Sequence, residues 1–361
     1  MRLPIRSRRS TTSTLAVLTS LALFHPAPAS AQGCAPSRFT SPSLGALGAD
    51  NGDIYLSKGT WQLGLGYRRV ASDELIIGHE ARNDLAPGGV ASFVHSQTLS
   101  LSLVYGVTDR LSFALNAPIS RGSLEQTFPD HLRHVNTASG LSEVSVSGSY
   151  WLRDARALQP GGNVALSLGV KAPTGKNDVQ GTYWKADGTA VPFPVSPAIE
   201  LGDGGWGYIL GIKGFRPLFE RSYLYGGGSY IFNPKKTTDV VRSPGSTLHW
   251  AAPDTWDASA GLSTLVSPAL GLSVNLGALA YGTPRRDVFG GRDDGERLPM
   301  TVVYASPGIG ITRGGHTFTF SVPLRAYMNF RPSYADDATG ARGGGGLARH
   351  LILSSYTVRF R

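Results

Sequence analysis

The chain has 361 residues, of which 41% are hydrophobic, 16% are charged and 46 are glycine. This composition excludes a protein of long helices, and no stretch reaches the roughly 18 uninterrupted apolar residues that a spanning helix needs. The net charge of +9 comes without a basic face or a basic aromatic motif, so we expect no nucleic-acid partner.

Residues 1–31 have the layout of a cleaved export signal. An apolar stretch runs from Leu15 to Phe24, and small residues follow at Ala29–Ala31. The basic residues before the apolar stretch are Arg2, Arg6, Arg8 and Arg9. We expect the cut after Ala31, which leaves Gln32 first. The signal holds four arginines and no acidic residue, so the formal charge falls from +9 to +5.

Residues 32–58 follow the signal and precede the first predicted strand. They include Cys34, the single cysteine, which excludes an intramolecular disulfide. Apolar side chains such as Phe39, Leu47 and Tyr55 suit either a periplasmic tail or a plug inside a barrel. We favour the plug.

From residue 59 onward the sequence alternates between apolar and small polar residues, the period of strands with two different faces. About twelve segments show it, each close to the ~9–11 residues that cross a bilayer at a tilt. They are 61–70, 94–106, 110–120, 141–153, 163–173, 205–216, 222–233, 255–266, 271–283, 300–312, 315–327 and 347–361. Pro173 and Pro323 fit poorly inside strands, because proline lacks the ladder donor, and predict bulges or shorter strands there.

Short and long connections alternate between these segments. Short turns are predicted near 106–109, 155–162, 217–221, 267–270 and 313–315. Longer polar segments are predicted at 71–93, 121–140, 174–204, 234–254, 284–299 and 328–346. This layout is typical of an outer-membrane barrel with short periplasmic turns and long extracellular loops. An even number of strands places both termini in the periplasm.

The charges inside the predicted strands decide which face meets lipid. When leucine, valine and aromatic residues define the outward face, seven charged residues take the opposite parity: Arg68, Glu143, Lys171, Lys213, Asp257, Arg325 and Arg359. Charge at the lipid midplane costs about 2–4 kcal/mol for arginine or lysine, so this bias indicates a membrane barrel. Five basic and two acidic residues would give the lumen a basic selectivity that favours anions. Mutual ion pairing that only fills the lumen is the alternative.

An outer-surface hydrolase is the rival from another class. His95 and Ser96 are adjacent, but neighbouring strand residues point to opposite faces, which separates a base from its nucleophile. His131 and His134 read as loop residues, and the acidic runs at 293–296 and 336–337 lack the spaced oxygens of a calcium loop. We therefore predict no catalytic residue, no metal and no cofactor.

Two short motifs carry a family resemblance. They are Lys171-Ala172-Pro173-Thr174-Gly175-Lys176 at a strand end and Leu201-Gly202-Asp203-Gly204-Gly205-Trp206-Gly207-Tyr208 at the next strand. With them the chain resembles the barrel family named for the MetA pathway of phenol degradation. The resemblance implies an outer-membrane barrel that admits small, often aromatic compounds, and it carries over no catalytic residue. Both motifs flank residues 174–204, where Tyr183, Trp184 and Phe193 are candidates for a gating lid; an ordinary loop is the alternative.

The sequence thus predicts an all-β protein, a transmembrane antiparallel up-and-down β-barrel in the bacterial outer membrane. We expect a pore or transporter for small aromatic or anionic compounds. A structural or adhesion barrel and the hydrolase remain alternatives. The expected partners are outer-membrane lipid, the permeant and the barrel assembly machinery, which reads a terminal aromatic residue; here Phe360 stands one residue before the end.

Overall fold

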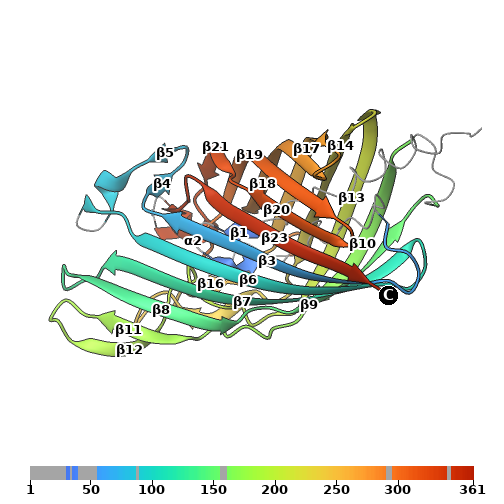
Figure 1. Cartoon of the computed structure of the whole chain (residues 1–361). Helices are drawn as coiled ribbons and strands as arrows, with labels where there is room; N and C mark the ends of the chain where they lie inside the picture. The colour runs from blue at the N-terminus through green and yellow to red at the C-terminus, as the bar shows by residue number, and fades with distance from the viewer. Residues whose placement is uncertain are drawn as a thin grey trace, which may run out of the picture.

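The computed structural model describes residues 30–32, 35–39, 55–86, 89–154, 161–289, 295–339 and 343–361. Within these ranges almost all regular structure is β, and no helix is long and apolar enough to cross a membrane. The two helical segments are η2 (Asn83–Leu85) and α2 (Tyr334–Thr339). The chain forms one closed antiparallel barrel, as the alternation predicts (Figure 1).

Fourteen segments of the described chain make up the barrel sheet, and they form twelve strands because two strands are each broken once. The unbroken strands are β3 (Trp61–Ser72), β6 (Phe93–Gly106), β7 (Leu111–Thr127), β10 (Asn163–Lys171), β13 (Gly207–Phe219), β14 (Ser222–Phe232), β17 (Thr255–Ser267), β18 (Leu272–Thr283), β19 (Met300–Arg313) and β23 (Leu351–Phe360). The broken strands are β8 (Arg133–Leu141) with β9 (Ser145–Trp151), and β20 (His316–Ser321) with β21 (Leu324–Phe330).

Each strand pairs with its neighbours in the chain, and the first strand pairs with the last. In that closing pair Trp61 of β3 lies opposite Phe360 of β23. Closure removes the unpaired edges that an open sheet would expose. Because Trp61 begins β3 and Phe360 ends β23, the start of the first strand and the end of the last strand lie at the same end of the barrel. Figure 1 shows the C-terminus at this end.

The two faces of the wall differ as the period-2 pattern predicts. On β6, Leu99 and Leu101 are exposed, whereas Thr98, the residue before Leu99, is buried. The exposed fraction reaches 66% at Leu168 and Leu276. An outward face this apolar suits contact with lipid. The inward face is rich in serine and threonine, whose hydroxyl groups are costly to bury in a dry core.

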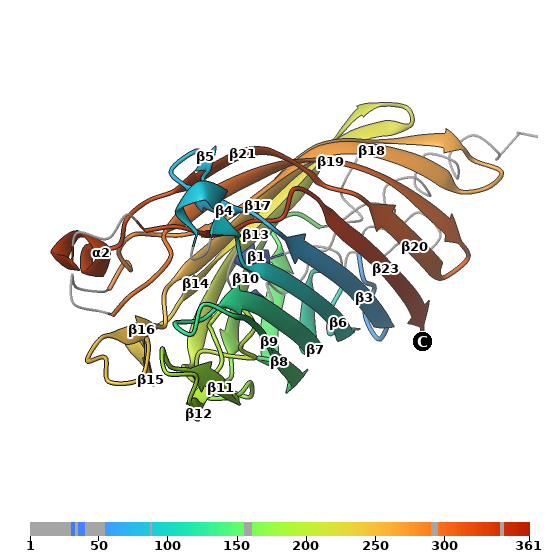
Figure 2. The same ribbon diagram turned by 90° about the vertical axis from the view of Figure 1, so that its left-hand side faces the viewer.

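Long connections gather at one end of the barrel and carry structure of their own (Figures 1 and 2). These pieces are β4 (Leu75–Ile77), β5 (Glu80–Ala81), β11 (Gln180–Trp184), β12 (Ala190–Pro194), β15 (Thr237–Val241), β16 (His249–Ala251) and β22 (Gly345–Gly346). The opposite end has tight turns, among them one with Gly271 at φ +62° and one with Gly314 at φ +58°. We call these the loop end and the turn end.

The structure changes several predicted boundaries. The segment 121–140, predicted as a polar loop, instead continues β7 and forms β8, paired from Ile119–Leu141 to Thr127–Arg133. This hairpin projects beyond the wall, where alternation no longer separates lipid from lumen. β10 ends at Lys171, before Pro173, and the last strand begins at Leu351 rather than 347. The break between β20 and β21 falls at Val322–Pro323, where proline interrupts the ladder.

Two short strands precede the barrel, β1 (Ser30–Gln32) and β2 (Ala35–Phe39), and pair with each other. Their backbones come close to β18 and β6, respectively. The predicted signal cut after Ala31 falls within β1, and most of the predicted signal, like Cys34, lies outside the described residues.

Candidate functional site in the barrel lumen

The seven charged residues predicted for the lumen all lie on the inner side of the wall. Six occupy inward positions of their strands, and Glu143 lies in the break between β8 and β9. Arg68, Glu143, Lys171, Asp257 and Arg359 are buried, whereas Lys213 and Arg325 are half-buried. Most of them have polar partners: Arg68 Nη2 donates to Thr98 Oγ1 at 3.3 Å, and Ser229 Oγ donates to Asp257 Oδ1.

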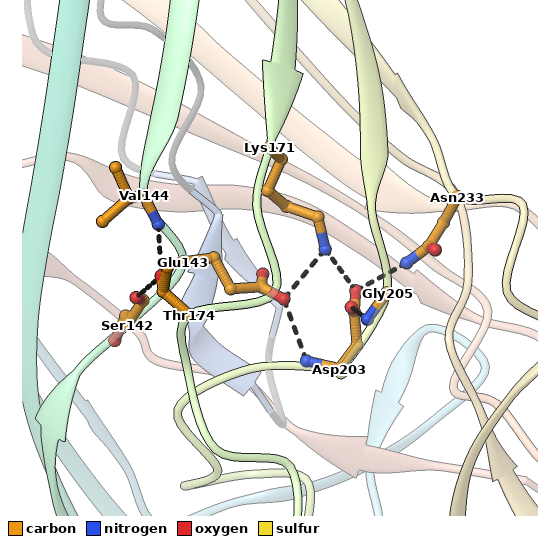
Figure 3. A network of polar contacts seen from close by, with 8 residues as sticks. All are labelled: Ser142, Glu143, Val144, Lys171, Thr174, Asp203, Gly205 and Asn233. Carbon is orange, nitrogen blue, oxygen red and sulfur yellow. Dashed lines mark hydrogen bonds and ion pairs between the residues drawn. The ribbon is translucent and has the colours of Figure 1, made fainter.

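A buried ion-pair cluster lies near the loop end of the lumen (Figure 3). Lys171 Nζ donates to Glu143 Oε1 at 2.9 Å and to Asp203 Oδ2 at 2.7 Å. Asn233 Nδ2 donates to the same Asp203 oxygen at 2.6 Å, and the Asp203 amide donates to Glu143 Oε1 at 3.0 Å. We call Glu143, Lys171, Asp203 and Asn233 the outer ion-pair cluster. It joins β10, the break between β8 and β9, and the end of β14 to the loop that contains Asp203.

The two motifs behind the family resemblance pack against each other at this cluster. A Cβ on Gly175 would lie 2.2 Å from the Leu201 carbonyl oxygen, and one on Gly202 would lie 2.5 Å from that of Gly175. Only glycine permits backbones to approach this closely. Thr174 Oγ1 donates to the Ser142 carbonyl at 2.6 Å and accepts from the Val144 amide at 2.8 Å, which bridges the break between β8 and β9. The close packing of the two motifs thus fixes the position of Asp203.

Residues 195–201 line the inner wall beside this cluster. Val195, Ala198 and Ile199 are buried against inward side chains of β6, β7 and β8. A Cβ on Gly122 of β7 would lie 2.8 Å from the Ile199 Cβ, so the wall has a glycine where the loop lies closest. This part of the loop therefore packs against the inner side of β6, β7 and β8 near the loop end.

The predicted lid residues lie elsewhere in the same loop. Tyr183 and Trp184 are on β11 and Phe193 is on β12. Tyr183 and Trp184 pack on Phe128 between β7 and β8, and Phe193 packs on Tyr183. Trp184 also stacks on His134, with ring centroids 3.9 Å apart. Figure 2 shows the paired strands β11 and β12 near β8. These aromatic rings therefore pack against one another and against the β7–β8 hairpin, whereas residues 195–199 of the same loop pack against the inner wall.

A second charged cluster connects two other loops at the same end. Glu74 accepts from Arg325 of β21 and from Arg349 Nε at 2.9 Å, and Arg325 also donates to the Leu347 carbonyl at 2.8 Å. Burial acts to raise the pKa of Glu74, but the hydrogen bonds from the two arginines hold it below its usual range. Ile76 and Leu347, from the connected loops, join an apolar cluster with inward residues such as Val302 and Leu351.

At the turn end the lumen is occupied by Tyr55, which precedes the first strand. Its ring is buried between Trp151 and Phe215, with centroid distances of 5.0 and 6.2 Å. Asn163 Nδ2 donates to the Tyr55 hydroxyl at 3.0 Å, and Arg359 Nη1 donates to the Tyr55 carbonyl at 3.2 Å. Asn163 is on β10 and Arg359 is on β23, which are well separated in the barrel. Tyr55 therefore contacts two distant parts of the wall at the turn end.

Lys213 stands near this aromatic group. Its Nζ lies 5.7 Å from the centroid of the Trp151 ring, a weak cation–π contact. Within the described residues it has neither a hydrogen bond nor an ion pair. Sequence reasoning found Lys213 by parity and named Tyr55 as one apolar residue of the favoured plug. It missed Asp203 as a lumen residue, because a loop between strands carries no alternation.

The features considered for catalysis or metal binding do not come together. His95 is exposed and Ser96 is buried, so they face opposite sides of the wall. His134 pairs with Asp130, and Asp336 accepts hydrogen bonds from Ser333. Across the part of the chain that the structure describes, no group of three histidine, cysteine or acidic residues could hold a metal ion. Asp293 and Asp294 lie outside it.

Glu296 is a carboxyl group at the loop end whose pKa is raised. Burial raises the pKa of Glu296 to about 6, although Arg242 Nη1 lies 3.1 Å from its Oε2 and acts in the opposite direction. The Glu296 backbone bonds to both sides of Trp250 on β16, through the Ala251 amide and the His249 carbonyl. Protonation of Glu296 therefore favours the packed loop.

We expect β16 to be held more firmly at pH 4.5 than at pH 7. Because the folded-state pKa is raised, the stabilisation is complete below the unfolded value near 4.5 and is lost as the pH rises through about 6. Hydrogen exchange at the Ala251 and Glu296 amides, corrected for intrinsic rates, measures this. The variant Glu296→Gln should make protection independent of pH between 4.5 and 7. Equal protection of the wild type at both values would contradict the assignment.

Comparison with solved structures agrees with the fold. The structure is similar to an outer membrane channel from Pseudomonas putida F1, with a TM-score of 0.59 and 15% sequence identity, covering 86% of this chain and 100% of that one. Weaker likenesses include a Pseudomonas aeruginosa FadL homologue, at a TM-score of 0.41, 11% identity and 98% of both chains. Another is the TodX deltaS2S3 mutant monoaromatic hydrocarbon channel, at 0.45, 11% identity, 94% of this chain and 100% of that chain. No protein-family model and no curated protein matches the chain. The fold is that of an outer-membrane β-barrel.

Proposed function

We propose that this chain is an outer-membrane pore or transporter that passes small aromatic or anionic compounds. The observation that carries the proposal is the distribution of polarity in the closed barrel. Apolar side chains cover the outward face, while charged and hydroxyl side chains face a lumen narrowed at both ends. Such a wall isolates a polar path from lipid. Membership of the MetA-pathway barrel family, which the two packed glycine motifs support, is part of the proposal.

Selectivity would come from the lumen cations, above all Lys213 and Arg68. Lys213 has no carboxylate partner within the described residues and lies beside the rings of Trp151 and Phe215. An ammonium group next to aromatic surface suits a permeant with a ring and a negative charge. Lys171 and Arg325 instead hold loops through ion pairs, so their charge is already compensated.

The proposal also covers the export of the chain and two closures, one at each end of the barrel. The signal would be cut after Ala31, and residues 32–58 would act as a plug anchored by Tyr55. Residues 195–203 would close the loop end, which would face outside the cell. Supporting evidence is the gathering of long connections at that end and the two-sided hold on Tyr55. Transport of this kind is passive and uses no cofactor.

A structural or adhesion barrel is the second candidate, because the outer ion-pair cluster could hold the loop end closed permanently. Single-channel conductance of the refolded mature protein, Gln32 onward, in a planar bilayer with a salt gradient separates the two. We expect discrete steps with a preference for anions. The preference should weaken in Lys213→Gln and Arg68→Gln but not in Arg216→Gln, an exposed arginine on the same strand as Lys213. A folded barrel that never conducts, even in variants that loosen either closure, would leave the structural candidate.

A further inference from the structure

One sector of the barrel changes abruptly from apolar to basic on its outward face. Near the loop end, Tyr67, Leu99, Ile119 and Leu141 form a row of paired, outward positions on β3, β6, β7 and β8. The next outward row toward the loop end consists of Arg69, Gln97, Arg121 and Ser139, all exposed. The apolar band therefore ends at the same level on four neighbouring strands, which lie side by side in Figures 1 and 2.

The two arginines in this row have no partner within the described residues. Arg69 and Arg121 both lie opposite Gln97, on the strands to either side of it, so their backbones are about 10 Å apart. His95, one outward position further along β6, is also exposed and without a described partner. The acidic Glu125 nearby is paired with Arg133 at 2.8 Å. We call Arg69, His95, Gln97 and Arg121 the outer basic patch; all four offer hydrogen-bond donors to the surroundings.

Three other strands differ from this sector at their loop ends. At the loop end of β10, β13 and β14 the outward residues include Val170, Tyr208 and Phe232, which are paired in register and are apolar or aromatic. A general need for charge at the rim would not produce this difference. The two arginines thus distinguish the loop ends of β3 and β7 from those of these three strands.

The level of the patch identifies the kind of partner. Residues just beyond the apolar band of a membrane barrel lie among the lipid headgroups. A guanidinium there extends its apolar stem along the wall and presents its charge to the headgroups, and its planar fork matches phosphate oxygens. We propose that the outer basic patch binds the phosphorylated headgroup of an outer-leaflet lipid. Arg69 and Arg121 would each contact phosphate, and Gln97 and His95 would contact neighbouring oxygens.

Native mass spectrometry of the full mature chain in detergent tests this, with diphosphorylated lipid A as the probe. The same glycolipid without its phosphates serves as the second ligand. The test variant is Arg69→Gln/Arg121→Gln. The matched control is Arg313→Gln, an exposed outward arginine at the turn end of β19. All three chains should show the same heat-modified gel mobility, since neither change touches an internal contact.

We expect the double variant to bind diphosphorylated lipid A at least about tenfold more weakly than wild type, because two charge-assisted contacts are lost. Arg313→Gln should bind like wild type, and the dephosphorylated glycolipid should bind weakly to every chain. Wild-type affinity in the double variant, or equal affinity for the dephosphorylated glycolipid, would overturn the proposal. Inorganic phosphate that binds as tightly as the lipid would also overturn it, by assigning the patch to free anions. The readout does not depend on transport, so failure of the pore proposal would leave it unaffected.

Discussion

Replacing Lys171 by methionine should destabilise the barrel by about 3–5 kcal/mol, the usual cost of removing one member of a buried ion pair. The lysine forms ion pairs with both Glu143 and Asp203, and all three side chains are almost fully shielded from solvent. Without it two carboxylates remain buried next to each other, joined through the Asp203 amide. The unfolding free energy in urea, followed by tryptophan fluorescence in detergent, measures the loss.

The matched control is Lys213→Met, which also removes a lumen ammonium group. Lys213 has no ion pair among the described residues, and methionine retains its apolar stem, so we expect a change below about 1 kcal/mol. The triple variant Lys171→Met/Glu143→Gln/Asp203→Asn should recover much of the loss, because it leaves no uncompensated charge. Equal stability of Lys171→Met and Lys213→Met would show that the outer ion-pair cluster contributes little.

The strands of this barrel could be predicted from sequence because alternation is a local signal. Lipid on one side and a polar lumen on the other impose period 2 over each crossing, and the twelve crossings follow directly from it. The inward placement of Lys171 and Lys213 needed only their parity. The signal fails where the chain leaves the bilayer: residues 121–140 form a hairpin that projects beyond the wall and read as loop.

The contacts that narrow the lumen could not be predicted, because they join distant residues without a periodic pattern. Lys171 meets Asp203 from 32 residues away, and Tyr55 meets Asn163 from 108 residues away. Asp203 lies in the Leu201–Tyr208 motif, so its importance was visible while its partner was not. Tyr55 was one of several apolar residues in a segment that suited a tail as well as a plug. Only the closed barrel brings opposite strands within reach of one tyrosine.

Removing the Tyr55 side chain should open the turn end and raise single-channel conductance. Loss of a buried aromatic ring costs about 3–5 kcal/mol of local packing, and Tyr55→Ala also leaves Asn163 without its hydroxyl partner. Residues 55–58 would then keep the contact between Arg359 and the Tyr55 carbonyl and the bond from the Lys58 amide to Asp109 Oδ1. Deleting residues 32–58 sets the upper limit of the increase. Tyr208→Ala, which removes an exposed outward ring on β13, should leave conductance unchanged.

Loosening the two ends of the barrel separately shows which of them limits permeation. If the turn end limits permeation, Tyr55→Ala and the deletion conduct more than wild type, whereas Lys171→Met gains little despite its lower stability. If the loop end limits permeation, the order reverses: the deletion conducts like wild type, and Lys171→Met, which releases Asp203 and with it residues 195–203, conducts more. If both ends limit permeation in series, the combined variant Tyr55→Ala/Lys171→Met should conduct more than either single variant. Unchanged conductance in the combined variant would mean that neither Tyr55 nor Asp203 lies on the path of the permeant.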